Sequence, residues 1–430
     1  MLNFRTRAGA FASATVPLTD SGNSSALMQP VRLDALTGLR IVAALAVYLS
    51  HTPIPQGFNP QLTNIMAAGG AGVTVFFVLS GFVLSYMYFE VLRCPTVGAV
   101  WSFVVARVAR IYPVYLLVLA SVVIFDPMGL FRDTGGWGWH AIGLQAWGPN
   151  PSFSQSFNGA AWSVSVELFL YAMLPLLIPL IAKLDRGMIW LVMTGAAPVF
   201  AVGLVTTVFW LDGRMDLPRW DPNSAYRWLY IHPFARLGDF IFGIVLARLY
   251  LRLAGRPGVD LVGSICSLVL LATTLLITAV RPSILQPFRY DLTYMLLGGF
   301  LILSLALSPR APVSRLLAWA PVVLLGEASY ALYLLHWPWM AKLGAGTWAA
   351  TGTATGLAHD ILVLCVLVGL ALLVHFAIER PSRRLLRGSL AARRLPITWQ
   401  LSGVAKRDTL DLATIQAEME AREPHRRVST

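Results

Sequence analysis

The sequence has little charge and few cysteines for its length. Asp, Glu, Lys and Arg make up 13% of the 430 residues and hydrophobic residues 57%, with a mean hydropathy of +0.66. Charged residues form about a quarter of a typical soluble domain, so these values exclude an ordinary soluble globular protein and indicate an integral membrane protein. The three cysteines form no CxxC pair and lie in or beside apolar segments. We therefore predict neither a disulfide framework nor a cysteine metal site.

Several well-known catalytic motifs are also missing. The sequence contains no Walker loop, no dinucleotide-binding glycine fingerprint and no His-Glu-x-x-His pair, which argues against the activities that those motifs support. Ser80 lies in Phe76-Phe-Val-Leu-Ser-Gly-Phe82 and not in a Gly-x-Ser-x-Gly nucleophile elbow. Close helix packing at Gly81 explains this segment better than nucleophilic attack by the serine.

The apolar residues form ten stretches long enough to span a bilayer, some of them only with tilt or polar interruptions. The fold class predicted is therefore an all-α polytopic membrane protein with about ten transmembrane helices in one bundle. No internal repeat separates the bundle into halves. The predicted stretches are 36–52, 69–88, 108–126, 160–182, 187–211, 229–251, 259–280, 291–308, 318–341 and 356–378.

The basic residues predict the orientation of this bundle. Inner loops are expected to be rich in Lys and Arg, and alternate loops carry most of them here when both termini are cytoplasmic. The formal charge of +12 is then an orientation signal in a multi-pass protein of the cell membrane, and nucleic-acid binding is not expected. The basic residues left in the predicted outer loops are Arg132, Arg214, Arg219, Arg227, Arg281, Arg289 and Lys342.

Three parts follow from this pattern. Residues 1–31, rich in Ala, Ser and Thr, are interpreted as a disordered N-terminal segment and not as a cleaved signal peptide. Residues 32–381 form the transmembrane domain, and residues 382–430 form a charged, basic cytoplasmic tail. A homo-oligomer stays open as an alternative to a monomer.

Arg40 and His51 are the first pair of chemical interest. Eleven helical residues turn the chain through roughly 1100°, so both side chains point the same way, about 16 Å apart along the helix axis. Ionisable groups inside a bilayer are costly and usually have a task. The alternative is an arginine snorkelling at one helix end and a histidine at the other boundary.

Arg107 and Arg110 are predicted at the inner start of the third span. Their i, i+3 spacing puts two guanidinium groups on one helix face, a pattern suited to phosphate oxygens. Ordinary positive-inside anchoring is the alternative for this pair.

Four further ionisable residues of interest lie within predicted spans. Glu167 needs a hydrogen-bond partner, either on another helix or at Ser163, because an unpaired buried carboxylate is costly. His336 lies towards the outer end of its span, with Tyr333 one turn earlier. For both Glu167 and His336 a purely structural role is an alternative to catalysis. Arg236 and Asp239 are predicted to form a buried structural ion pair.

Seven segments, taken in order, resemble the acyltransferase-3 family of integral membrane O-acyltransferases and together cover residues 36–381. Thr37 and Ile41 replace an Asp and a Gly of the common opening pattern, a form that looks like the actinobacterial branch with its antibiotic-tailoring members. The segments are Leu36-Thr-Gly-Leu-Arg40 through His51, Phe76 to Phe82, Arg107-Val-Ala-Arg110-Ile-Tyr-Pro113, Trp162-Ser-Val-Ser-Val-Glu167, Arg236-Leu-Gly-Asp239, Ser329 to His336, and Glu379-Arg-Pro381.

The resemblance implies transfer of a short acyl group from acyl-CoA to a hydroxyl of a carbohydrate, glycolipid or macrolide acceptor, with no metal. His51 is then the general base, and Glu167 and His336 orient it, handle protons or bind the acceptor. Arg107 and Arg110 hold the CoA phosphates, with Arg40 along the path of the donor. The substrate-binding positions implied are Trp162, Ser80 and Tyr333.

Two other classes of function stay open at this stage. A proton-coupled transporter or flippase would use intramembrane His, Glu and Arg residues as a relay, although the missing internal repeats argue against it. A catalytically inactive scaffold or sensor that uses the charged tail is the other alternative.

Overall fold

The computed structural model describes residues 33–125 and 136–384, which belong to one compact unit. These residues contain helices and no β-strand, which confirms the all-α fold class. Each of the ten predicted stretches corresponds to a long helix. The ten helices are α1 (Asp34–His51), α3 (Ala71–Leu92), α4 (Val97–Phe125), α7 (Trp162–Leu184), α8 (Met188–Leu211), α9 (Pro233–Leu253), α10 (Val259–Val280), α11 (Leu292–Leu307), α13 (Ala320–Lys342) and α15 (Ala354–Val374).

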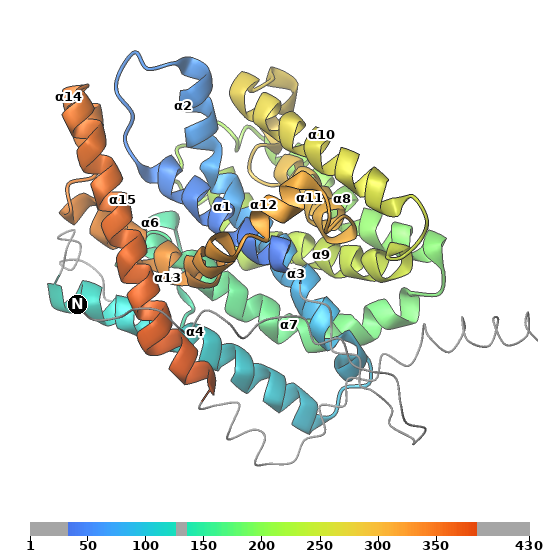
Figure 1. Ribbon diagram of the computed structural model, residues 1–430. Helices are drawn as coiled ribbons and strands as arrows, with labels where there is room; N and C mark the ends of the chain where they lie inside the picture. The colour runs from blue at the N-terminus through green and yellow to red at the C-terminus, as the bar shows by residue number, and fades with distance from the viewer. Residues whose placement is uncertain (1–32, 126–135, 385–430) are drawn as a thin grey trace, which may run out of the picture. The chain divides into compact units, whose positions relative to one another are not determined.

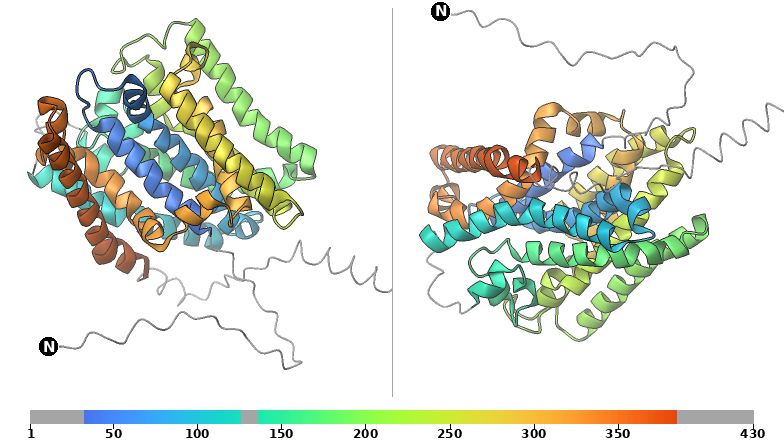
Figure 2. Two further views of the ribbon diagram at one scale, coloured as in Figure 1. Left: turned by 45° about the horizontal axis from the view of Figure 1, so that its top comes forward. Right: turned by 90° about the horizontal axis from the view of Figure 1, so that it is seen from below.

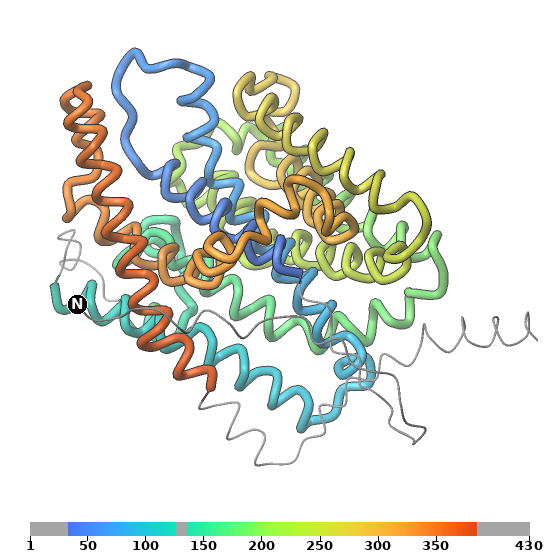
Figure 3. Tube along the Cα trace, viewed as in Figure 1, coloured from blue at the N-terminus to red at the C-terminus, as the bar shows by residue number. Residues whose placement is uncertain are grey.

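Short helices join the long ones. They include α2 (Pro60–Ala67), α5 (Trp137–Ala141), α6 (Pro151–Gln155), α12 (Pro312–Leu317) and α14 (Thr347–Thr351), besides the 3₁₀ turns η1 (Ala68–Gly70), η3 (Gln145–Trp147) and η5 (Ser283–Phe288) and the π-helical turns η4 (Tyr226–Ile231) and η6 (His375–Glu379). A long loop leaves α1 after His51, and α2 returns the chain towards α3 (Figure 3).

Six helical segments of the described chain are long and apolar enough to cross a bilayer. They are Pro60–Leu92, Val97–Phe125, Trp162–Leu184, Met188–Leu211, Val259–Val280 and Ala354–Arg384. Outside this set stand α1 with Arg40 and His51, α9 with Arg236 and Asp239, and α13 with His336. Helix α11, which has 16 residues, also lies outside it. The total of about ten spans and the cytoplasmic termini stay predictions.

The centre of the bundle is formed by α1, α3, α9 and α13. Helix α1 packs against α3 and α13, α3 packs against α9, and α15 covers α13 from the side (Figures 1 and 2). Glycine allows these close approaches, because a Cβ on Gly326 would overlap the backbone carbonyl of Thr37, and one on Gly81 would overlap that of Phe240. The expectation of close helix packing beside Ser80 is therefore confirmed.

One boundary prediction is wrong in a way that matters for the site. The third span was expected to start at residue 108, whereas α4 starts at Val97. The hydroxyl of Thr96 accepts the backbone N–H of Ala99 there, and the apolar residues that follow extend the helix. Arg107 is thus about 15 Å into the helix, and the two arginines lie within α4 and not at its start.

A buried arginine ties α9 to its neighbours. Arg236 Nη1 lies 3.1 Å from Asp239 Oδ2, 3.0 Å from Asp291 Oδ1 and 3.2 Å from the hydroxyl of Thr74 on α3. Arg236 and Asp239 are completely buried, so the predicted structural ion pair is confirmed. Asp291, which directly precedes α11, is the partner that the sequence did not reveal.

Candidate active site

Two histidines from distant parts of the chain meet between α1 and α13. His51 Nδ1 lies 3.2 Å from His336 Nε2, and the two rings stack with their centroids 5.3 Å apart. The indole of Trp337 stands at 85° to the His51 ring, 4.5 Å between centroids. His336 is buried, whereas His51 is partly exposed to a cavity.

Hydrogen bonding defines which nitrogen of each ring carries a proton when both are neutral. His336 Nδ1 lies 2.6 Å from the backbone carbonyl oxygen of Tyr333. A carbonyl oxygen only accepts, so His336 Nδ1 must donate, and a neutral His336 then accepts at Nε2. His51 must therefore donate from Nδ1 to His336. This leaves His51 Nε2 unprotonated, the state that a general base requires.

His51 lies on the wall of the larger of two described cavities, with a volume of about 450 Å³. We name it the His51 cavity. Its walls come from α1, α2, α3, α6, α7, α10, α11 and α13 and from the segments around η1, η4 and η5. The polar and aromatic residues that line it are Ser50, His51, Gln155, Trp162, Arg219, Tyr226, Tyr230, Arg281, Gln286, Arg289, Tyr290, Thr293, Tyr294, Tyr333 and Trp337.

A second cavity of about 290 Å³ begins where the first ends. We name it the Arg110 cavity, since Arg110 lines it together with Arg40 and Glu167. Val73 and Tyr333 line both cavities, so the two adjoin at these side chains. Arg40 and His51 were predicted to occupy one face of α1. In the structure each of them lines a cavity, Arg40 the Arg110 cavity and His51 the His51 cavity, and the two cavities adjoin.

The hydrogen-bond partner of Glu167 is neither Ser163 nor a residue on another helix. The Tyr171 hydroxyl, one turn later on α7, donates to Glu167 Oε1, whereas the Ser163 hydroxyl bonds to the Ala160 carbonyl. Glu167 also interacts electrostatically with Arg110 and Arg40, which come from α4 and α1. The carboxylate offsets part of the positive charge in the Arg110 cavity.

Arg107 and Arg110 are separated in spite of their spacing. Arg110 lines the cavity, but Arg107 is buried beside it, with Nη2 3.1 Å from the Tyr88 hydroxyl. Its guanidinium carbon lies 5.4 Å from the centroid of the Tyr88 ring and 5.9 Å from that of Tyr171. Arg107 therefore does not line the cavity. Its guanidinium contacts the ring of Tyr171, which lines the cavity and donates to Glu167.

The three residues with predicted substrate contacts all line a cavity. Trp162 lies in the His51 cavity, with its ring 5.1 Å from that of Tyr230, and Ser80 lies in the Arg110 cavity. Tyr333 stands at the junction, and its hydroxyl donates to the Ala160 carbonyl at 3.0 Å.

The closing Glu379-Arg-Pro381 segment joins the ends of α13 and α15. Glu379 is buried and lies 2.8 Å from His375 Nδ1, and Arg383 donates to its other oxygen. Arg380 pairs with Glu327 of α13 at 3.1 Å. These contacts explain the segment as an attachment of η6 to α13 near the Arg110 cavity.

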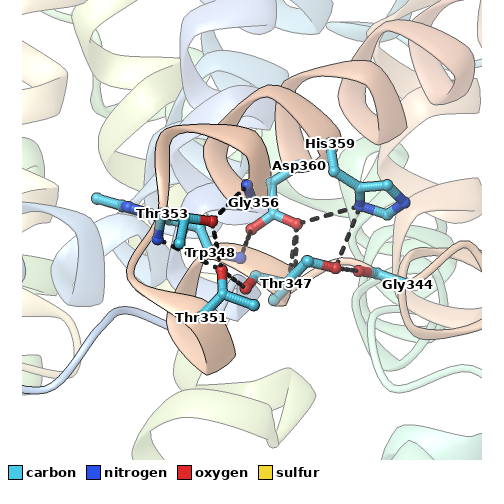
Figure 4. Close-up of polar contacts among 9 residues, drawn as sticks. Gly344, Thr347, Trp348, Thr351, Thr353, Gly356, His359 and Asp360 are labelled. Carbon is cyan, nitrogen blue, oxygen red and sulfur yellow. Dashed lines mark hydrogen bonds and ion pairs between the residues drawn. The ribbon is translucent and has the colours of Figure 1, made fainter.

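A polar cluster at the start of α15 holds the loop beyond His51. Asp360 accepts the backbone N–H groups of Gly346, Thr347 and Trp348 at 3.0 to 3.2 Å, which caps α14 (Figure 4). The Trp348 ring, fixed in this way, lies 4.9 Å from the Phe58 ring. The connection from α1 to α2 is therefore braced from outside the cavity.

Sequence reasoning missed the tyrosines and arginines that the 212–232 and 281–294 segments contribute. Tyr226 and Tyr230 stack at 5.3 Å, and Arg219 donates to the Tyr226 hydroxyl at 2.8 Å. The feature of the sequence that could have pointed to these residues is the high density of aromatic and basic residues in the two connections. In the described part of the chain, no three His, Cys, Asp or Glu side chains gather in a way that could hold a metal ion.

The fold and the site define a class: a helical membrane protein with two adjoining cavities, one of which is lined by a member of a histidine pair. The chain belongs to the acyltransferase-3 family, whose Acyltransferase domain matches residues 33–380. It is thus a member of a family of membrane O-acyltransferases.

Known relatives agree with this membership. Acyltransferase MdmB from Streptomyces mycarofaciens is 32% identical over 391 residues, which cover 85% of this chain and 94% of the relative. The peptidoglycan O-acetyltransferase OatA of Listeria monocytogenes is 22% identical over 71% of this chain, and the O-acetyltransferase OatA of Staphylococcus aureus is 22% identical over 73%. The chain spans about half the length of both OatA proteins. No solved structure matches.

Proposed function

We propose that this protein transfers a short acyl group, acetyl in the simplest case, from acyl-CoA to a hydroxyl of a carbohydrate, glycolipid or macrolide-type acceptor in the cell membrane. The observation that carries the proposal is the histidine pair, which leaves Nε2 of a neutral His51 unprotonated on the wall of the His51 cavity. One cavity would hold the acceptor and the other the thioester end of the donor.

The chemical step needs little beyond a base and alignment, because a thioester is already activated. His51 Nε2 takes the proton of the acceptor hydroxyl while its oxygen attacks the thioester carbonyl carbon. The C–S bond then breaks, an ester forms, and the proton passes to the departing thiolate to give free CoA. His336 keeps His51 in the required tautomer and stabilises the imidazolium that forms by accepting its Nδ1–H hydrogen bond.

The Arg110 cavity suits the donor for two reasons. Arg40 and Arg110 provide positive charge close to its lining, and Glu167 compensates only part of it. Its volume of about 290 Å³ is at the lower end for ligand pockets, so it would take the thioester end and part of the pantetheine arm. Arg40 and His51 are about 16 Å apart along α1, a length that the extended arm can follow. Arg107 would act indirectly, by holding the ring of Tyr171 in the cavity wall that Arg110 also lines.

The test is acyl transfer by purified protein from labelled acetyl-CoA to a panel of glycan, glycolipid and macrolide acceptors, with the O-ester identified by mass spectrometry. We expect His51→Ala to lower kcat about 10²- to 10⁴-fold, the usual contribution of a general base. His359→Ala is the matched control, because the side chain of His359 is 42% exposed and lines neither cavity. Full activity of His51→Ala would disprove the base, and absence of ester with every acceptor would disprove the function.

A further inference from the structure

The mouth of the His51 cavity carries three arginines and no carboxylate. Arg219 comes from the 212–232 connection, and Arg281 and Arg289 come from the 281–294 connection. All three are exposed at the rim, whereas Trp162 is buried deeper in the wall. Neither Asp nor Glu is among the residues that line the cavity. The rim is therefore strongly positive on the side from which the proposed acceptor would enter.

These arginines have only neutral partners in the described chain. Arg219 donates to the Tyr226 hydroxyl, and Arg281 Nη2 to the Asn64 carbonyl at 3.0 Å. Arg289 donates to the Gln286 side chain, the Tyr290 hydroxyl and the Met215 carbonyl at 3.2 to 3.4 Å. A guanidinium has five N–H donors and binds a carboxylate or phosphate more strongly than a neutral oxygen. The charge of all three residues is thus available to an anion.

Two features indicate that this rim is built for a ligand. Arg281 has a left-handed backbone conformation (φ 49°), which residues with a side chain rarely adopt. An arginine at a position that favours glycine suggests that its side chain is needed there. In addition, the side chain of Gln155 is buried in the cavity wall, and one of its amide atoms, Oε1, has no hydrogen-bond partner.

The predicted topology adds a third argument. Outer loops normally carry few basic residues, and seven are expected there in this chain, including Lys342 and Arg132. Three of the seven line this one cavity. Nearly half of the expected outer basic residues therefore lie at a single opening.

We infer that the acceptor carries a phosphate or carboxylate, which Arg219, Arg281 and Arg289 bind at the rim while the hydroxyl to be acylated reaches His51. The inference rests on the proposed function and narrows its acceptor from any hydroxyl compound to an anionic one. Gln155 would bind a second hydroxyl of the same molecule, and the stacked Tyr226 and Tyr230 would pack against its body.

Binding and turnover test this separately. Affinity for glucose 1-phosphate and for glucose is measured by calorimetry in phosphatidylcholine nanodiscs, with saturating CoA present so that the donor site is filled. We expect glucose 1-phosphate to bind at least tenfold more tightly than glucose. Each Arg→Gln substitution at positions 219, 281 and 289 should weaken it about threefold to tenfold, as for exposed charged contacts. The triple variant should lose the preference, and Lys342→Gln should keep it.

Equal affinity of wild-type protein and triple variant for glucose 1-phosphate would overturn the inference. So would loss of the wild-type preference when phosphatidylglycerol is added to the nanodiscs, since the arginines would then bind a lipid headgroup. Among acceptors that are turned over, the anionic member of each pair should have the higher kcat/KM, and equal values would overturn the inference while leaving acyl transfer itself established. Absence of all turnover would affect the proposed function and not the binding result.

Discussion

Replacing His336 tests the histidine pair more specifically than replacing the base itself. In His336→Ala the Nδ1–H of His51 loses its acceptor 3.2 Å away. The proton of the neutral ring is then free to move to Nε2, which would make the nitrogen intended for the acceptor hydroxyl a donor and not a base. His336 is not among the residues that line the His51 cavity, so binding of the acceptor should change little.

The size of the effect follows from the bond that is lost. A neutral hydrogen bond contributes about 0.5–1.5 kcal/mol, and 1.4 kcal/mol is about a factor of ten in rate. Loss of the correct tautomer adds to this, up to the full contribution of a base, about 10²- to 10⁴-fold. We therefore expect kcat to fall about tenfold to hundredfold in His336→Ala, less than in His51→Ala, with the acceptor KM unchanged.

His336→Gln separates this role from simple packing. The Gln Oε1 can occupy the position of His336 Nε2 and accept the His51 proton, but it does not titrate. It should recover most of the activity lost in the alanine variant. The assay is steady-state transfer in detergent, with thermal unfolding and CoA binding measured on the same samples, because an alanine in place of a buried His336 leaves a cavity. Wild-type kcat in His336→Ala, or a glutamine variant as slow as the alanine variant, would refute the tautomer argument.

Two more predictions use other parts of the molecule. Arg110→Gln should raise the KM for acetyl-CoA about tenfold, as expected for a charge-assisted contact. Arg107→Gln should raise this KM less, because Arg107 lies outside the cavity. Equal CoA affinity in both variants and the wild type would remove the proposed role of this pair. Burial lowers the pKa of His140, outside the spanning helices, to about 4, against a weaker opposing hydrogen bond to Phe153. The unfolded chain then binds more protons between pH 6.5 and 4, so stability should fall on acidification through this window by up to about 3 kcal/mol. His140→Gln should unfold without this pH dependence, and identical acid profiles in thermal melts would contradict it.

The helices and the pairing of residues along one helix could be predicted from sequence. Hydropathy located all ten long helices, and the eleven-residue spacing of Arg40 and His51 put both on one face of α1. These features depend on periodicity within one segment. The Arg236–Asp239 pair was found for the same reason, since its i, i+3 spacing is local.

Contacts between segments could not be predicted in the same way. The i, i+3 spacing predicted that Arg107 and Arg110 act together. Two side chains at this spacing still diverge by about 60° around the helix axis. Arg107 packs against Tyr88, and Arg110 is the one that lines the cavity. The approach of His336 to His51 depends on how closely α13 packs against α1, where Gly326 meets Thr37. The rim arginines could not be predicted as site residues, because they lie in connections without helical periodicity.

A comparison of Arg236 with Arg40 shows how the structure distinguishes a structural charge from one that is available to a ligand. Arg236 is held by Asp239, Asp291, the Thr74 hydroxyl and two backbone carbonyls, so its charge and donors are already used. Arg40 forms no hydrogen bond or ion pair with the described residues. Arg110 beside it repels it, and Glu379 and Glu167 offset only part of this cost from a distance. A cation in an apolar bundle is costly without a partner. An anionic donor that binds beside Arg40 would supply the missing partner and so gain binding free energy. Arg236 on α9 offers no such gain, because its partners are already present.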